Sequence, residues 1–146
     1  MKIRKATKKD SQLYLKLRKG YLKEYFKNSS KKITDEKIKK EFNKLISEDY
    51  FIFFLFNNKE VLGYLSASIH TNVWQKGAYI EDVFIFPKSR RKGYAKKLIK
   101  YFIKFAKLKR VNKIRAGVDI NNKKVIHLNK KLGFKIDQYE MEKKIK

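Results

Sequence analysis

The chain has 146 residues, a formal net charge of +25 and no cysteine. With 42% hydrophobic and 14% aromatic residues, it carries enough apolar surface to predict a single folded domain over residues 1–146. The absence of cysteine excludes a disulfide framework and a thiolate metal site, and 2 histidines are too few for most zinc sites. We therefore expect no bound metal.

The positive charge, taken alone, would suggest a polyanionic partner. Only six of the 39 basic residues are arginine, however, and the lysines are scattered through every segment instead of being gathered in one stripe. We therefore do not expect nucleic acid to be the main partner. No window approaches the roughly 18 uncharged apolar residues of a membrane span, and the N-terminus lacks a signal-like run, which predicts a cytoplasmic protein without a membrane partner.

The first half of the chain predicts one strand, two helices and a hairpin. Residues 2–6 form a short predicted strand, and a helix with regularly spaced apolar residues follows Thr7 or Asp10. A second helix begins near Thr34, after a polar loop over 28–32. Apolar runs on either side of the polar turn 57–60 predict a β-hairpin over 50–68.

The second half predicts strands alternating with helices. A long strand over 77–86 ends at Pro87, which cannot donate to a sheet. A helix to about Lys109, a strand over 114–120 and a helix over 122–132 follow, and residues 134–145 are expected to form one or two closing strands. Antiparallel strands followed by a β-α-β-α-β order predict an α/β (α+β) domain around one central sheet.

The turn after the long strand has a composition that suits phosphate. Its sequence is Arg90-Arg91-Lys92-Gly93-Tyr94-Ala95, and a helix begins within it. Backbone N–H groups at a helix N-terminus carry roughly half a positive charge and can hold a diphosphate. The glycine permits close approach of the ligand, and the three basic residues supply cations. The alternative is a solvated basic loop in front of an amphipathic helix.

This turn resembles the cofactor motif of the GCN5-related N-acetyltransferase (GNAT) family, Gln/Arg-x-x-Gly-x-Gly/Ala at a strand-to-helix turn. The preceding strand, 80–87, is also similar to the family pattern, as are Asn122 and Leu132-Gly133-Phe134 in the next helix. The resemblance implies a mixed, mostly antiparallel sheet, flanked by about four helices and splayed at the cofactor site. It also implies acetyl-CoA as the acetyl donor.

The resemblance assigns cofactor binding to two stretches of backbone and one side chain. Main-chain groups of Val83, Phe84 and Ile85 would pair with the pantetheine arm as though it were a further strand. Amides from Arg91 to Lys96 would hold the pyrophosphate. Asn122 would bond the pantetheine or pyrophosphate region, with a plain helix cap as the alternative.

Glu81 and Asp82 are the candidate catalytic acids, and the pair resembles the equivalent strand of polyamine acetyltransferases. Because side chains alternate along a strand, we expect only one of the two to face the substrate cleft, and we favour Glu81 as the base, directly or through water. The alternative is that either carboxylate merely offsets local lysines. Asn129 stands where the family places a tyrosine general acid, and it has no ionisable proton. Tyr94 and Tyr139 are other candidates for that role.

The predicted reaction is direct transfer of an acetyl group to a primary amine. The acceptor is left open between a small polyamine-like or aminoglycoside-like amine, a protein N-terminus and an amino-acid amine. A cationic acceptor would require a local acidic patch, which we expect from Glu48, Asp49, Glu81 and Asp82. A homodimer is compatible with the resemblance. The competing hypothesis is a catalytically silent acyl-CoA-binding or nucleic-acid-associated module, which would bind its ligand without turnover.

Overall fold

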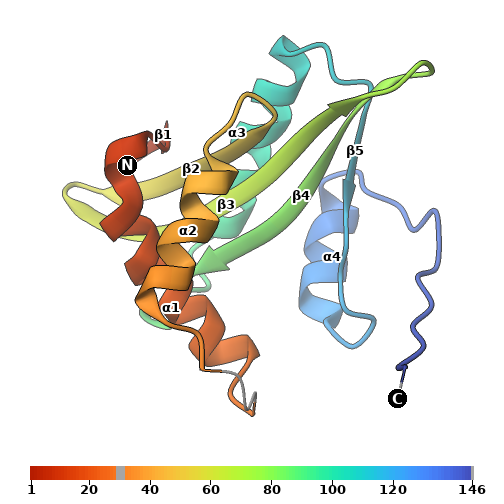
Figure 1. The fold of residues 1–146 in the computed structure, drawn as a ribbon. Helices are drawn as coiled ribbons and strands as arrows, with labels where there is room; N and C mark the ends of the chain where they lie inside the picture. The colour runs from red at the N-terminus through yellow and green to blue at the C-terminus, as the bar shows by residue number, and fades with distance from the viewer. Residues whose placement is uncertain (29–31, 146) are drawn as a thin grey trace.

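One sheet of five strands runs through the protein in the order β1-β2-β3-β4-β5 (Figure 1). The computed structural model describes residues 1–28 and 32–145, so 29–31 of the predicted polar loop lie outside the described residues. The strands are β1 (Lys2–Lys5), β2 (Tyr50–Asn57), β3 (Glu60–Thr71), β4 (Lys76–Ile85) and β5 (Lys113–Ala116). The first three pairings are antiparallel and the β4–β5 pairing is parallel, which confirms the predicted mixed sheet.

Four α-helices cover the two faces of this sheet. Helices α1 (Ser11–Tyr25) and α2 (Asp35–Leu45) lie on one face, and α3 (Tyr94–Leu108) and α4 (Lys123–Lys131) lie on the other (Figure 1). Strand β2 is buried on both sides because its residues alternate between the two cores. Phe54 packs under α1 and α2, whereas Phe53 packs under α3. None of the helices in the described part of the chain has the length and apolar character that a membrane span requires.

The helix ends follow the capping residues seen in the sequence. The side chain of Thr34 accepts from the Lys37 N–H at 3.3 Å and starts α2. Gly93, with φ of +75°, starts α3, and Gly133, with φ of +90°, follows the end of α4. Both glycines adopt the left-handed conformation that side chains disfavour.

The closing strands predicted over 134–145 are absent, and this prediction is wrong. The segment has no regular secondary structure and contacts β5 through ion pairs from Asp137 to Lys113 and Arg115, each at 3.2 Å. Its apolar residues do not share one face, since Ile136 is out of phase with Tyr139 and Met141 and all three are exposed. A strand needs an apolar face to bury as well as an edge to pair with, and this segment lacks the first.

Candidate functional site

Strands β4 and β5 separate after a short parallel pairing, as Figure 1 shows. Residues Gly77–Ile80 pair with Lys113–Ala116, and beyond this point β4 pairs with β3 alone as far as Ile85. One edge of β4 over 81–85 is therefore open to a further extended segment. This is the splay that the family resemblance implies.

Two of the three residues predicted to bind the pantetheine arm present their backbone to this open edge. The Phe86 N–H donates to a β3 carbonyl at 2.9 Å, and hydrogen bonding alternates along an antiparallel pair. Phe84 therefore faces β3, whereas Val83 and Ile85 face the opening. The Ile85 carbonyl already accepts from Arg90 Nε at 2.9 Å. An extended ligand would thus pair mainly with Val83.

The start of helix α3 is the turn predicted to form a phosphate cradle. The first amide bonded within the helix is Lys97 N–H, which donates to the Gly93 carbonyl at 3.0 Å. The three preceding helical amides have no intrahelical acceptor, and they belong to Tyr94, Ala95 and Lys96. A Cβ at Gly93 would meet no atom within 4 Å, so the space around the Cβ position of this residue, at the start of the helix, is open. This geometry fits a diphosphate group.

Arg90, one of the three basic side chains predicted beside the cradle, is engaged elsewhere. Its Nη1 donates to Oε1 of Glu24 on α1 at 2.7 Å, and its Nη2 contacts the second oxygen of the same carboxylate. The hydrogen bond that Arg90 donates to Glu24 raises the pKa of Arg90 above its ordinary value. Arg90 therefore fastens the loop to α1, whereas Arg91 and Lys92 are exposed and face solvent.

A β-bulge in β4 places Glu81 and Asp82 on the same face of the sheet. The pairing of β3 with β4 shifts by one residue after Ser66, which leaves Glu81 as an extra residue. Ser66 Oγ donates to Asp82 Oδ2 at 3.4 Å, and Ser68 Oγ donates to Glu81 Oε1 at 3.2 Å. Because the two serines are two residues apart and share a face, the two carboxylates share it too. The expectation that they point to opposite faces is wrong because the bulge interrupts the alternation.

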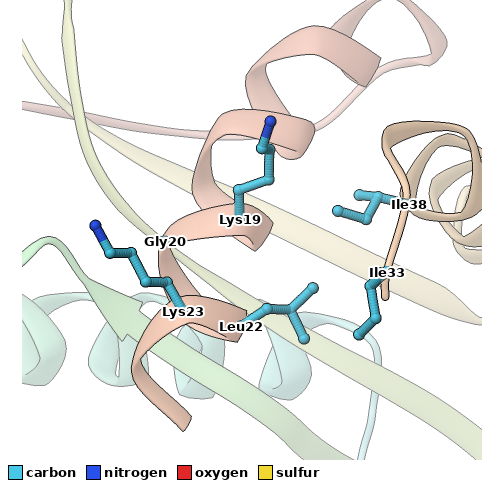
Figure 2. Close-up of a pocket in the computed structure, with 6 residues that line it drawn as sticks. All are labelled: Lys19, Gly20, Leu22, Lys23, Ile33 and Ile38. Atoms are coloured by element: carbon cyan, nitrogen blue, oxygen red, sulfur yellow. The ribbon is translucent and has the colours of Figure 1, made fainter. Parts of the chain in front are cut away.

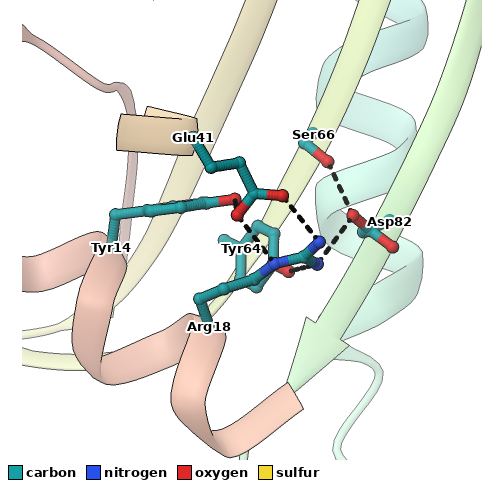
Figure 3. Close-up of polar contacts among 6 residues, drawn as sticks. All are labelled: Tyr14, Arg18, Glu41, Tyr64, Ser66 and Asp82. Atoms are coloured by element: carbon teal, nitrogen blue, oxygen red, sulfur yellow. Dashed lines mark hydrogen bonds and ion pairs between the residues drawn. The ribbon is translucent and has the colours of Figure 1, made fainter. Parts of the chain in front are cut away.

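Arg18 of α1 lies between Glu41 of α2 and Asp82 of β4 (Figure 3). Its Nη2 donates to Glu41 Oε1 at 2.9 Å, and its Nη1 donates to Asp82 Oδ2 at 3.1 Å. Tyr64 Oη lies 3.2 Å from the same Nη1, and Tyr14 Oη donates to Glu41 Oε2 at 3.0 Å. Burial acts to lower the pKa of Arg18, but its phenol and carboxylate neighbours raise it overall. The guanidinium stays charged and joins both helices to the sheet.

Tyrosines near these carboxylates have raised pKa values. Burial and then the charge of Glu81 raise the pKa of Tyr50 to about 12, and the charges of Asp82 and Glu41 act in the same direction. Burial and then Asp82 raise the pKa of Tyr21 to about 12. Both phenols therefore keep their protons at neutral pH.

The predicted acidic patch has a different composition from the one expected. Glu48 and Asp49 are exposed in the turn before β2, and the third carboxylate of the cluster comes from α2 as Glu41. Four side chains around the acid pair were missed in the sequence: Arg18, Glu41, Ser66 and Ser68. The serines carried a signal, because they alternate within an otherwise apolar strand. Arg18 carried a weaker one, as a charge on the apolar stripe of a helix.

Helix α4 carries the two asparagines predicted to serve the reaction. Asn122 caps the helix by accepting from the Val125 N–H at 3.3 Å, so its side chain acts as the plain cap considered above. Asn129 lies in the last turn of α4 and is 9% exposed. Its backbone carbonyl accepts from the Phe134 N–H at 3.0 Å. Tyr139, a candidate acid, is 87% exposed in the irregular tail. A role for Asn129 toward the leaving thiolate stays a prediction.

A surface hollow of about 360 Å³ lies on α1 at some remove from these groups (Figure 2). It is lined by Lys19, Gly20, Leu22, Lys23, Ile33 and Ile38. These side chains include no carboxylate, imidazole or hydroxyl, so the hollow lacks the acidic groups that we expect to bind a cationic amine. We therefore locate the site by its chemical groups and the open edge of β4, and not by the volume of this hollow.

Comparison with known proteins gives a family match and several structural neighbours. The chain matches the model of the acetyltransferase (GNAT) family over residues 14–134. No curated protein sequence matches it. An aminoglycoside acetyltransferase from an uncultured soil metagenomic sample, solved with sisomicin, has a TM-score of 0.83 at 17% identity, over 99% of this chain and 96% of its own.

Two further solved structures share the fold. Aminoglycoside N-acetyltransferase AAC(6')-Iy, solved with CoA, has a TM-score of 0.80 at 19% identity, over 99% of this chain and 93% of its own. A transcriptional regulator from Bacillus halodurans C-125 has a TM-score of 0.83 at 17% identity, over 99% of both chains. At such identities these neighbours show the fold alone.

The family match spans β4 with its bulge, the cradle of α3 and helix α4, which are the parts that build the site. Members of this family take their acetyl group from acetyl-CoA. The chain therefore belongs to the GNAT family of acetyltransferases and is an acetyl-CoA-dependent N-acetyltransferase.

Proposed function

We propose that the protein acetylates a small cationic primary amine, which binds on the α1–α2 face of β4 and, after it loses a proton, attacks the thioester of acetyl-CoA directly, with coenzyme A as the leaving group. The observation that carries this proposal is the bulge, which brings Glu81 and Asp82 onto one face beside the open edge of β4. A strand without the bulge would offer one carboxylate to each face. Two carboxylates on one side can both bind an ammonium group and accept its proton.

The residues at the open edge fit the donor. Val83 would pair with the pantetheine arm, and the free amides at the start of α3 would hold the pyrophosphate with help from Arg91 and Lys92. Acetyl-CoA, when bound, supplies the acetyl group as a thioester. Arg90 supports this arrangement indirectly, because its bonds to Glu24 and to the Ile85 carbonyl hold the loop against α1.

On the acceptor side, Glu81 and Asp82 have different roles in the proposed reaction. Asp82 is held in place by Arg18 and Ser66, so it is suited to orient the ammonium group. Among the described residues, Glu81 accepts a side-chain hydrogen bond from the Ser68 hydroxyl alone and is exposed, so it is free to take the proton that the amine must lose before it attacks. Two of the proteins that share this fold are named as aminoglycoside acetyltransferases, and the proposed acceptor class is compatible with those names.

The test of donor binding is calorimetric titration with acetyl-CoA at moderate salt, with ADP as a control for unspecific attraction of phosphates. We expect saturable binding of acetyl-CoA that ADP does not reproduce. Gly93→Glu should weaken it by at least about tenfold, because a carboxylate would enter the space in front of the free amides.

Gly133→Glu is the matched control for this titration. Gly133 also has a positive φ, of +90°, and open space around its Cβ position, but it lies at the far end of α4. This variant should bind acetyl-CoA as the unmodified protein does. Equal binding of acetyl-CoA and ADP that disappears at high salt would contradict the proposal. Release of coenzyme A with a panel of amines then tests turnover.

A further inference from the structure

Both oxygens of Glu41 are occupied by neighbouring side chains. Oε1 accepts from Arg18 Nη2 at 2.9 Å, and Oε2 accepts from Arg18 Nε at 3.1 Å and from Tyr14 Oη at 3.0 Å. The guanidinium fork thus covers the whole carboxylate, in the two-bond geometry that makes such pairs strong. The side chain of Arg18 is 16% exposed and that of Glu41 is 35% exposed, so the pair is partly shielded from water on the Arg18 side.

The other two carboxylates of the cluster are less covered. Asp82 shares Arg18 through a single bond from Nη1 to Oδ2. Glu81 receives only the Ser68 hydroxyl, and among the described residues no cation pairs with it. An acceptor approaching this face therefore meets Glu81, which no described cation pairs, Asp82, which receives one bond from Arg18, and Glu41, whose two oxygens both accept from Arg18.

We infer that Arg18 is a specificity-determining residue, which by pairing with Glu41 keeps the site from favouring diammonium acceptors over monoammonium ones. This inference rests on the acceptor side of the proposed function. One ammonium group would bind at Glu81 and Asp82. The second ammonium group of a diammonium acceptor would approach the Arg18–Glu41 pair. Because the charges of this pair sum to zero, the second group would gain no net attraction. Without Arg18, Glu41 would become a binding group for that second charge.

The test compares two amines of equal length, n-butylamine and 1,4-diaminobutane, both protonated at neutral pH. Binding is measured by NMR titration of the backbone amides of Ser66 and Ser68, which lie beside the two carboxylates. The unmodified protein should bind the two amines within about threefold of each other. Arg18→Gln should shift the ratio toward the diamine by about tenfold, the size of one added charge contact at a partly exposed site.

Two variants test whether Glu41 is the group that Arg18 covers. The double variant Arg18→Gln, Glu41→Gln should return the ratio to that of the unmodified protein, because the uncovered carboxylate is gone. Glu41→Gln alone should shift the ratio the other way, against the diamine, because the charge of Arg18 is no longer offset. This second variant keeps the inference testable if Arg18→Gln fails to fold.

Lys19→Gln is the matched control. It removes one positive charge from the adjacent position of α1, where the ammonium pairs with Asp35 at the surface, and it should leave the ratio unchanged. The inference is overturned if Arg18→Gln leaves the ratio unchanged, if Lys19→Gln shifts it equally, or if neither amine perturbs Ser66 and Ser68. Release of coenzyme A with the same amines is measured separately. Binding ratios as expected without turnover would contradict the proposed function and leave the role of Arg18 supported.

Discussion

Glu81 differs from its neighbour Asp82 in how tightly its side chain is held. Asp82 accepts from a guanidinium and a hydroxyl, whereas Glu81 accepts from one hydroxyl on an exposed face. A group that must gain and lose a proton in each cycle works best when no fixed cation holds its charge. At the residue scale, this contrast is the basis on which we propose proton transfer at Glu81 and orientation of the amine at Asp82.

We expect Glu81→Gln to lower kcat by about 100-fold or more, because a general base typically contributes on that order. Acetyl-CoA affinity should be unchanged, since the cradle lies on α3. Steady-state rates of coenzyme A release and calorimetry check the two expectations. Glu36→Gln is the control, because this carboxylate is exposed on α2 and pairs only with Lys40. If Glu81→Gln keeps the full kcat, Glu81 is not the general base.

At the element scale, the first helix is anchored to the first strand by one buried carboxylate. Asp10 accepts from Arg4 at 2.7 and 2.8 Å and from the Thr7 N–H at 2.7 Å. The Arg4 hydrogen bond is the main cause that lowers the pKa of Asp10 to about 2. This anchor fixes where α1 begins, and hence where Arg18 meets the sheet.

Asp10→Asn should cost about 2 kcal/mol of unfolding free energy at pH 7, the equivalent of the lowered pKa. A pKa that is depressed in the folded state contributes stability above the unfolded value and loses it as pH falls. The difference between the variant and the unmodified protein should therefore shrink from about pH 4 toward pH 2.

Urea unfolding at pH 7 and at pH 2.5 measures both parts of this expectation. Asp35→Asn is the control, because its ion pair with Lys19 is exposed and should contribute little at either pH. A cost that stays constant with pH would show that Asp10 acts through packing and not through its charge.

The helices and most strands could be predicted because their signals are local. Apolar spacing and caps such as Thr34 and Gly93 lie within a few residues of the elements that they define. The bulge at Glu81 could not be predicted, because it depends on the register between β3 and β4. The strands expected over 134–145 failed for a related reason, since a strand depends on a partner and a buried face elsewhere in the chain.

In the candidate site, too, features that depend on neighbouring residues could be predicted and contacts between distant segments could not. The cradle at Gly93 is a contiguous motif, so the sequence located it. The pairing of Arg18 with Glu41 and Asp82 joins two helices and a strand far apart in the chain, and no spacing rule connects them. The position of Arg90 in the motif predicted a contact with phosphate. In the structure it pairs with Glu24 on α1, a residue far away in the sequence.

At the scale of the whole molecule, the net charge of +25 opposes the compact state through self-repulsion. The ion pairs among the described residues are mostly at the surface and contribute little each. Raising NaCl from about 50 to 500 mM shortens the Debye length from over 10 Å to under 5 Å, which screens the repulsion. We therefore expect the Tm to rise by several degrees.

Differential scanning calorimetry at several salt concentrations checks this expectation. Repeating the series with a second monovalent salt at equal ionic strength separates screening from ion-specific effects. A Tm that falls with salt would mean that attractive ion pairs outweigh the excess of lysine.

The absence of cysteine also helps the turnover measurements, because thiol reagents will detect only released coenzyme A.

The extra residue in β4 also affects whether Glu81 and Asp82 bind one nitrogen atom together or two nitrogen atoms separately. Carboxylates on one face of a regular strand are two residues, roughly 6 to 7 Å, apart along the chain. The bulge halves this backbone spacing by making Glu81 and its successor neighbours on one face. A single –NH3⁺ group, with three donors on one atom, can then reach both carboxylates at once. In the proposed mechanism, the nitrogen that Asp82 orients would therefore be the same nitrogen that loses its proton to Glu81.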